Sequence, residues 1–114
     1  MLVKKKMTKD QLLELEDITK EFDKLIMRKQ TKKKMKIRYN NPEDEDKYIL
    51  VESLDDIIEV KKEEIHIEEK TGEYIKLMFN IPKTEGTYKA HVLVKNKKDG
   101  KIEEVLKFTI QVVP

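Results

Sequence analysis

The stretch EYIKLMFNIPKTEGTYKAHVLVKNKKDGKIEEVLKFTIQVV, residues 73–113, decides the fold. Apolar and polar side chains alternate in its first part, where Ile75, Leu77, Phe79 and Ile81 share one side. This alternation predicts a half-buried antiparallel strand, and Pro82 ends it because proline has no N–H for the ladder. Two more strands follow, with the inward positions Tyr88, Ala90, Val92, Val94, Leu106, Phe108, Ile110 and Val112.

The turn between the last two strands sets their register. A two-residue Asp99-Gly100 turn would place the inward Val92 opposite Lys107. A slip of one residue in the register moves every side chain of a strand to the opposite face of the sheet. A three-residue loop over residues 98–100, with Gly100 left-handed beside a bulge, avoids this conflict. We therefore predict the three-residue loop, with the pairs Val92–Leu106, Ala90–Phe108 and Tyr88–Ile110.

Length and composition indicate one domain, and the absence of cysteine is compatible with a reducing compartment. The 114 residues suffice to bury roughly two thirds of the surface of the unfolded chain. Charged residues make up 42% of the chain, but the Ile, Leu and Val residues are periodic, so we expect it to fold. The absence of cysteine excludes disulfides and a thiol nucleophile. No apolar run approaches the roughly 20 residues of a membrane span, so we expect a cytoplasmic protein.

Four shorter strands are expected upstream, around residues 35–39, 48–51, 56–60 and 65–67. The turn Asn40-Asn41-Pro42 ends the first of these strands, because Asn side chains bond nearby backbone and Pro restricts φ. Seven short strands with frequent turns predict a mainly β fold, an immunoglobulin-like antiparallel β-sandwich. We divide the chain into an N-terminal helix and basic linker, residues 1–33, and the sandwich, residues 34–114.

The front of the chain has the pattern of an amphipathic helix. Thr8 and Gln11 form a capping-box pattern, and the helix is expected to continue to about Lys29. Part of its apolar stripe also fits a short coiled-coil seam. The stripe could pack on the sandwich or on a larger parent protein, mediate homo-oligomerisation, or bind a partner helix. The seam residues are Leu15, Ile18, Phe22 and Leu25.

A basic segment, RKQTKKKMKIR, follows at residues 28–38. Residues 1–41 hold 13 basic and 6 acidic side chains, a net charge of +7, whereas the remainder carries −5. This asymmetry suggests an acidic partner surface such as tubulin, or attraction between the two ends of the chain. A solvated junction and a nuclear-import signal are alternatives. Only Tyr39 offers a nearby stacking ring, which disfavours nucleic acid. The candidate partner-binding residues are Arg28, Lys29, Lys32, Lys33, Lys34, Lys36 and Arg38.

Chemistry-bearing residues are scattered. His66 and His91 lie on predicted strands, each on the face opposite its apolar neighbours, so we expect both to face solvent. Ser53 is the only serine. The acidic run at residues 43–46 lacks the Gly and terminal Glu of a calcium loop and is expected to be solvated. Adjacent carboxylates on a strand point to opposite faces, so they cannot form a catalytic pair. We therefore expect no enzyme, no catalytic residue, no metal and no cofactor.

Several motifs resemble a known family. They are RYNNP, then IIEVKKEEIHI, then a Phe-x-x-Pro…Gly-x-Tyr pattern formed by Phe79, Pro82, Gly86 and Tyr88. Over residues 35–113 the chain resembles major-sperm-protein-like domains, especially the ASH-type immunoglobulin-like domains of abnormal-spindle, Hydin and nephrocystin proteins. The resemblance implies a tyrosine corner at Tyr88 and a non-enzymatic adaptor of cilia, centrosomes or microtubule-associated assemblies. The basic, threonine-rich peptide-binding loop of membrane-contact members has no counterpart here.

We expect a protein-interaction module at the cilium, basal body or cytoskeleton. Binding would use the basic segment, the helix stripe, or an exposed sheet edge around residues 57–67. The alternative is a structural scaffold that self-associates through its helix. Pro114 directly follows the last strand, which suggests a domain of a longer protein.

Overall fold

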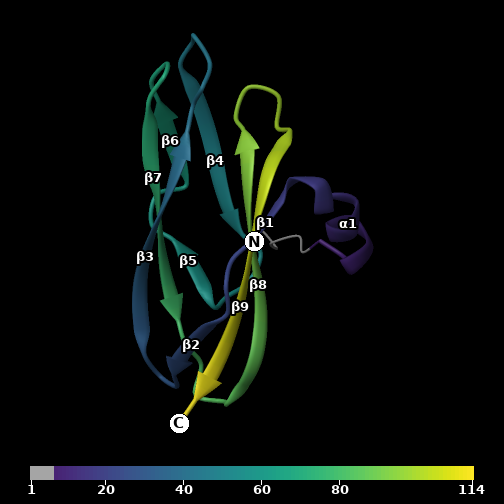
Figure 1. Ribbon diagram of the computed structural model, residues 1–114, viewed down its shortest axis with the longest axis vertical. Helices are drawn as coiled ribbons and strands as arrows, with labels where there is room; N and C mark the ends of the chain where they lie inside the picture. Colours follow the sequence, from purple (N-terminus) through teal and green to yellow (C-terminus); the bar gives the residue numbers. More distant parts are fainter. Residues whose placement is uncertain (1–6) are drawn as a thin grey trace, which may run out of the picture.

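The computed structural model describes residues 7–114, and it is a sandwich of two β-sheets with a short helix on one side (Figure 1). The seven predicted strands and the mainly β immunoglobulin-like class are confirmed, and two further strands precede them. The elements are α1 (Lys9–Glu14), a 3-10 turn (Glu16–Ile18), β1 (Thr19–Glu21), β2 (Leu25–Arg28), β3 (Lys32–Asn40), β4 (Lys47–Ser53), β5 (Ile58–Val60), β6 (Glu64–Ile67), β7 (Gly72–Asn80), β8 (Gly86–Asn96) and β9 (Ile102–Val113).

The two sheets differ in size and in strand direction. The larger sheet has the order β1-β9-β8-β4-β6, and β2 also pairs with β9. Both β1 and β2 run parallel to β9, whereas the other neighbours in this sheet are antiparallel. The smaller sheet has the order β3-β7-β5 and is antiparallel. In this sheet β3 is a nine-residue edge strand.

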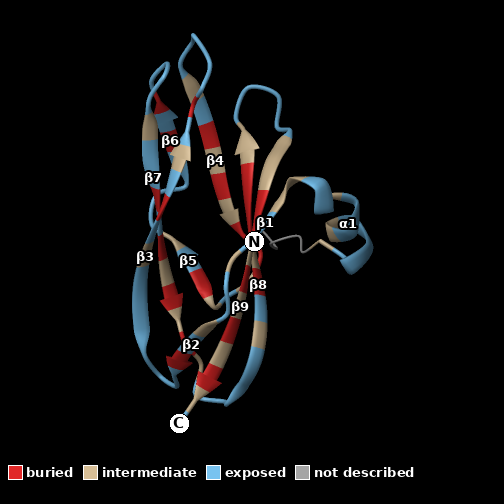
Figure 2. Ribbon diagram, viewed as in Figure 1, coloured by how far each residue is buried: buried red, intermediate tan, exposed pale blue. Residues whose placement is uncertain are grey.

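The core lies between the sheets, where the buried positions of facing strands meet (Figure 2). The inward residues predicted for β7, β8 and β9 are confirmed: all are buried except Tyr88, which packs against the core as a half-buried residue. Phe79 meets Phe108 edge to face, with ring centroids 5.3 Å apart. This aromatic pair links the smaller sheet to the larger one, and aromatic contacts of this geometry stabilise cores beyond their buried area.

The β8–β9 hairpin has the predicted register, although the turn achieves it differently. Val92 pairs with Leu106, Ala90 with Phe108, and Tyr88 with Ile110, as predicted. Gly100 is left-handed, with φ of 73°. Asn96 pairs with Lys101, so the loop is one residue longer than expected, and a β-bulge at Glu103 restores the register.

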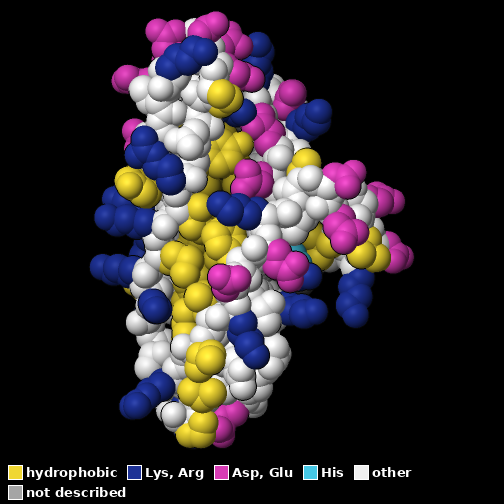
Figure 3. All heavy atoms as spheres, in the orientation of Figure 1, with side chains coloured by type: hydrophobic (Ala, Val, Ile, Leu, Met, Phe, Trp, Pro, Cys, Tyr) yellow, Lys and Arg dark blue, Asp and Glu magenta, His cyan; other side chains and the backbone are white. Residues whose placement is uncertain are grey.

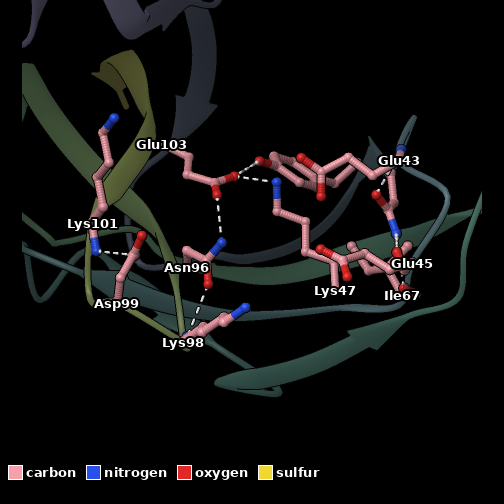
Figure 4. A network of polar contacts seen from close by, with 11 residues as sticks. Glu43, Glu45, Lys47, Ile67, Asn96, Lys98, Asp99, Lys101 and Glu103 are labelled. Atoms are coloured by element: carbon pink, nitrogen blue, oxygen red, sulfur yellow. Dashed lines mark hydrogen bonds and ion pairs between the residues drawn. The ribbon is translucent and has the colours of Figure 1, made fainter.

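Two predicted turn devices are confirmed. Asn41 is 1% exposed, and its amide nitrogen donates to the carbonyl oxygens of Glu45 and Ile67, at 2.9 and 3.2 Å (Figure 4). Its Oδ1 accepts from the N–H of Glu43, which closes the turn after β3. The hydroxyl of Tyr88 donates to the carbonyl oxygen of Thr84 at 2.7 Å, the expected tyrosine corner.

The N-terminal helix is much shorter than predicted. The Thr8–Gln11 capping box is present, which confirms where the helix begins. The prediction that it continues to about Lys29 is wrong, because α1 ends at Glu14 and residues 19–28 form β1 and β2. The hydroxyl of Thr19 donates to the carbonyl oxygen of Leu15 at 2.8 Å, a local bond that competes with helical pairing.

The open edge of β9 explains this difference. β2 reads Leu25, Ile26, Met27, Arg28 and alternates in burial, with Met27 in the core and Ile26 67% exposed. Pairing with β9 satisfies the backbone of this segment and buries its apolar side at the same time. The predicted boundary between an N-terminal part and the sandwich, at residues 33 and 34, stays a prediction. Strands on both sides of this boundary belong to the sandwich.

A second apolar cluster lies on the outer face of the larger sheet, which sequence reasoning missed. Leu54, Leu93 and Val105 are buried there, and Leu12 and Leu15 pack against them. Because this cluster lies on the face of the larger sheet opposite the main core, Leu12 and Leu15 cover that face. This packing holds α1 against the larger sheet and away from β3 (Figure 1).

Candidate functional site

The outer face of the smaller sheet gathers most of the predicted basic residues. Because β3 alternates, Met35 and Ile37 turn inward while the even-numbered side chains point outward. Register with β7 adds Tyr74 and Lys76 to the same outer face. Figure 3 shows Lys and Arg side chains along the edge where Figure 1 places β3. We call this surface the basic face, formed by Lys32, Lys34, Lys36, Arg38, Tyr74 and Lys76.

Like charges stand directly opposite one another on the basic face. Lys36 pairs in register with Lys76, an arrangement that is destabilising in an antiparallel sheet. Tyr74 lies beside them and is 47% exposed. The guanidinium carbon of Arg38 is 5.3 Å from the Tyr74 ring centroid, and the Lys36 ammonium is 5.8 Å from it. The ring therefore organises two cations by cation–π contact and leaves their charge unneutralised.

The cations of the basic face are not paired with carboxylates in the described part of the chain. Among residues 7–114, ion pairs involve Lys47, Lys61, Lys70, Lys95, Lys97 and Lys107, together with His66. None of the basic-face cations takes part in an ion pair within this described part. A surface of this kind attracts acidic ligands, and its attraction weakens as salt screens it.

The structure does not bring every predicted basic residue onto this face. Arg28 ends β2 and Lys29 begins the turn into β3, where the N–H of Lys29 donates to the carbonyl oxygen of Val113. The side chain of Lys33 leaves β3 on the side opposite to Lys32 and Lys34. These three cations therefore border the basic face without belonging to it.

The predicted apolar seam is used inside the domain. Phe22 stacks on Phe108 with ring centroids 4.6 Å apart, and Leu25 packs against the same core. Leu15 packs on the second cluster, and Ile18 is half-buried in the 3-10 turn. The four residues do not share a helix, so the seam expected for self-association does not form. The helix and β3 also lie on opposite sides of the molecule (Figure 1).

A polar network joins the two sheets at the end that carries the β8–β9 turn (Figure 4). Glu103, the bulged residue, accepts from the Tyr39 hydroxyl at 3.1 Å and from the Asn96 amide at 2.9 Å, and it pairs with Lys47. Burial alone would raise the pKa of Glu103, but these hydrogen bonds outweigh it and hold that pKa below its ordinary value. Burial and the nearby Glu103 raise the pKa of Tyr39. The network is satisfied internally and has a structural role.

The two histidines have different surroundings. His66 is exposed, as predicted, where it stacks on Tyr48 at 4.5 Å and contacts Asp46 at 2.8 Å. His91 is half-buried, because α1 and the 3-10 turn cover its face of the larger sheet. A cleft of about 230 Å³ lies there, lined also by Leu12 and Lys107. The prediction that His91 faces solvent is therefore wrong, since the helix ends early and packs beside it.

Other kinds of site find little support in the described part of the chain. Across residues 7–114 there is no group of three or more His, Cys, Asp or Glu residues arranged to hold a metal ion. Over the same range, no helix is both long and apolar enough to cross a membrane. The strand edges around residues 57–67, also predicted as a binding surface, include β5 at the edge of the smaller sheet and β6 at the edge of the larger one.

Comparison with solved structures confirms the fold. The chain is 12% identical to the ASH/PapD-like domain 7 of human CEP192, with a TM-score of 0.58, covering 84% of this chain and 81% of that one. WR4, a C. elegans major-sperm-protein family member, is 10% identical with a TM-score of 0.54, covering 79% and 92%. A family 123 glycoside hydrolase from Clostridium perfringens is 10% identical with a TM-score of 0.63, covering 79% of this chain but 23% of the enzyme. The same fold thus occurs in different settings, so function must come from the site.

Comparison with curated proteins gave no match. The model of the family NPH4 Ig-like domain 4 matches residues 19–113, which begins at β1 and includes β1 and β2 within the domain. The match agrees with the resemblance to ASH-type, major-sperm-protein-like domains and with the observed sandwich. The chain belongs to the NPH4 Ig-like domain 4 family.

Proposed function

We propose that this protein is a non-enzymatic adaptor domain that binds an acidic protein surface through its basic face. The observation that carries the proposal is the set of cations on β3 and β7 that form no ion pair within residues 7–114. A fold selected only for stability would gain from neutralising Lys36 and Lys76, which stand directly opposite each other. An acidic partner would supply that neutralisation.

The setting that we propose is a ciliary, basal-body or centrosomal assembly in the cytoplasm. The support is the membership in the NPH4 Ig-like domain family and the fold shared with the ASH/PapD-like domain of CEP192. Acidic cytoskeletal surfaces such as tubulin match the chemistry of the basic face. Its centre, where Arg38 and Lys36 flank Tyr74, offers a stacking surface beside the charges. Attraction of this kind increases the association rate and depends strongly on salt.

The experiment is localisation of the tagged protein in ciliated cells. The test variant carries Lys34→Glu, Lys36→Glu and Lys76→Glu, which reverse the centre of the basic face. The matched control carries Lys24→Glu, Lys98→Glu and Lys101→Glu, exposed positions that change the net charge equally elsewhere. Thermal unfolding of both variants verifies that the fold is retained.

The proposal predicts enrichment of the wild type and the control at the ciliary base, axoneme or centrosome, and a diffuse signal for the test variant. If the test variant is enriched like the wild type, binding through the basic face is contradicted. Diffuse wild-type protein would contradict the ciliary setting.

A further inference from the structure

A cleft of about 570 Å³ opens between the two sheets on the opposite edge of the smaller sheet from β3. Its walls are the last residues of β4 and the outer edge of β5, with the loop between them at one end. Its lining residues include Glu52, Ser53, Asp56, Ile58, Val60 and Glu63. This cleft is distinct from the basic face in both location and charge.

The wall formed by β4 offers unpaired backbone. β4 pairs with β6 over residues 47–50, and the N–H of Val51 donates to the carbonyl oxygen of Glu63. The ladder alternates, so Ser53 directs its N–H and C=O to the same side as Val51. The segment that leads into β6 does not extend this pairing as far as Ser53. At Lys61 the chain still belongs to the other sheet, where the N–H of Lys61 donates to the carbonyl oxygen of Lys76. No strand within residues 7–114 pairs with β4 on that side of Ser53.

The wall formed by β5 is also an edge. β5 pairs with β7 on one side, where the carbonyl oxygen of Ile57 accepts from Asn80 and the N–H of Lys61 donates to Lys76. By alternation, Ile58 and Val60 direct their backbone groups away from β7 and toward the cleft. The N–H of Ile58 donates to the carbonyl oxygen of Asp55 in the turn before β5. The C=O of Ile58 and the N–H and C=O of Val60 therefore remain for an occupant of the cleft.

The cleft is strongly acidic. Five carboxylate residues line it, and of the lining residues that the structure describes none is Lys or Arg. Two of the five have cationic partners: Glu52 pairs with Lys95 at 2.9 Å and Glu59 with Lys61 at 3.1 Å. Asp56 and Glu63 are exposed and form no ion pair within residues 7–114. Charge complementarity therefore favours a basic occupant.

We propose that this cleft binds an extended, lysine- or arginine-bearing segment of a partner protein by strand addition between β4 and β5. Main-chain hydrogen bonds to Ser53 and Val60 would provide register, and the carboxylates of Asp56 and Glu63 would select basic side chains. The edges offer about three residues each, roughly 10 Å of extended chain, so the recognised segment is short. The proposal goes beyond the proposed function, since it adds a second site of opposite charge to the basic face.

The test is a binding titration with synthetic peptides of defined chemistry. The probe is a fluorescent hexapeptide that alternates Lys with Val. The second peptide is the same sequence with N-methylated valines, which keeps the charge and removes backbone donors. Fluorescence anisotropy measures Kd for wild-type protein, for Asp56→Lys with Glu63→Lys, and for a control with Lys34→Glu and Lys36→Glu on the basic face. Amide chemical shifts map the contacts, and sedimentation monitors self-association.

We expect the probe to shift the amides of Ser53 and Val60, and the cleft variant to weaken binding at least about tenfold. N-methylation should weaken binding by a similar factor, and the basic-face control should bind like the wild type. Equal binding to the cleft variant, equal binding of the N-methylated peptide, or no binding to the wild type would overturn the proposal. Dimers of the unliganded protein that compete with the probe would also overturn it, because a second copy would then fill the cleft. Failure of the basic-face variant to localise in cells leaves this result unaffected.

Discussion

The Phe22 ring stacks on the Phe108 ring, with centroids 4.6 Å apart and planes inclined by 8°. Phe22 lies between β1 and β2, and its N–H donates to the carbonyl oxygen of Lys107 on β9. Its side chain thereby closes the core beside Phe108, which is fully buried. Residues 19–28, which include β1, Phe22 and β2, are therefore packed into the sandwich.

Truncation of Phe22 tests this relationship. Phe22→Ala should lower the free energy of unfolding by about 2 kcal/mol, because a half-buried ring and its stacking contact are lost. The control is Ile26→Ala, an exposed position on β2 where we expect a change within about 0.5 kcal/mol. Urea denaturation measures both. A Phe22→Ala protein as stable as the wild type would show that this segment does not support the core.

The lysine pair on the basic face predicts a substitution that raises stability. Lys36→Glu replaces a like-charge cross-strand pair with Lys76 by an attractive pair, which should increase the free energy of unfolding by roughly 0.2–1 kcal/mol. The control is Lys32→Glu, opposite the uncharged Asn80, where no such gain is expected. Thermal or urea unfolding at low salt compares the two. A loss of stability with Lys36→Glu would show that the Lys36–Lys76 pair does not destabilise the sheet.

The tyrosine corner predicts a local effect. Tyr88→Phe removes the hydroxyl that donates to Thr84 at 2.7 Å while it preserves the ring in the core. The free energy of unfolding should fall by about 1 kcal/mol, since a single net hydrogen bond is lost. Hydrogen exchange should rise most in the loop between β7 and β8. Uniform exchange rates together with unchanged stability would show that the corner does not anchor this loop.

The half-buried His91 predicts a pH dependence of stability. Burial lowers the pKa of His91 below its ordinary value of 6.5, and Lys107 and Lys89 act in the same direction while Asp55 opposes them. Between the folded and unfolded pKa values the unfolded chain binds more protons, so stability is lost as the pH falls through 6.5 toward the folded pKa.

The variant His91→Gln should flatten this part of the pH profile. Urea midpoints measured from pH 7 down to pH 5 should fall less steeply for His91→Gln than for the wild type, because the differential proton binding is removed. Parallel profiles for the two proteins would contradict the assignment to His91.

The β8–β9 register could be predicted because the local pattern is unambiguous. The two-residue turn would place Lys107 opposite the inward Val92, whereas the alignment that pairs Val92 with Leu106 keeps Lys107 out of the core. The structure adopts the second alignment. The turn itself was less predictable, since a longer loop with a bulge at Glu103 gives the same register. Glu103 accepts from Tyr39, which lies 64 residues away in the sequence, and from Asn96 across the hairpin, and the residues around Glu103 do not predict these hydrogen bonds.

The N-terminal segment was mispredicted for a physical reason. The spacing of Leu15, Ile18, Phe22 and Leu25 fits a helix, but the open edge of β9 offers backbone pairing and core burial together. Tertiary context then overrides the local preference. The candidate site was predicted in part: charge identified the cations of β3, but only the register with β7 shows that Lys76 and Tyr74 complete the basic face.

Site-specific photo-crosslinking tests the basic face most directly. A benzoylphenylalanine at position 74 replaces an exposed tyrosine at the centre of that face, and the same group at position 13 replaces an exposed leucine on α1. Irradiation in ciliated cells should give discrete high-mass adducts from position 74, weakened by raised salt in permeabilised cells, and none from position 13. Adducts from position 13 alone, or none from position 74, would contradict binding through the basic face.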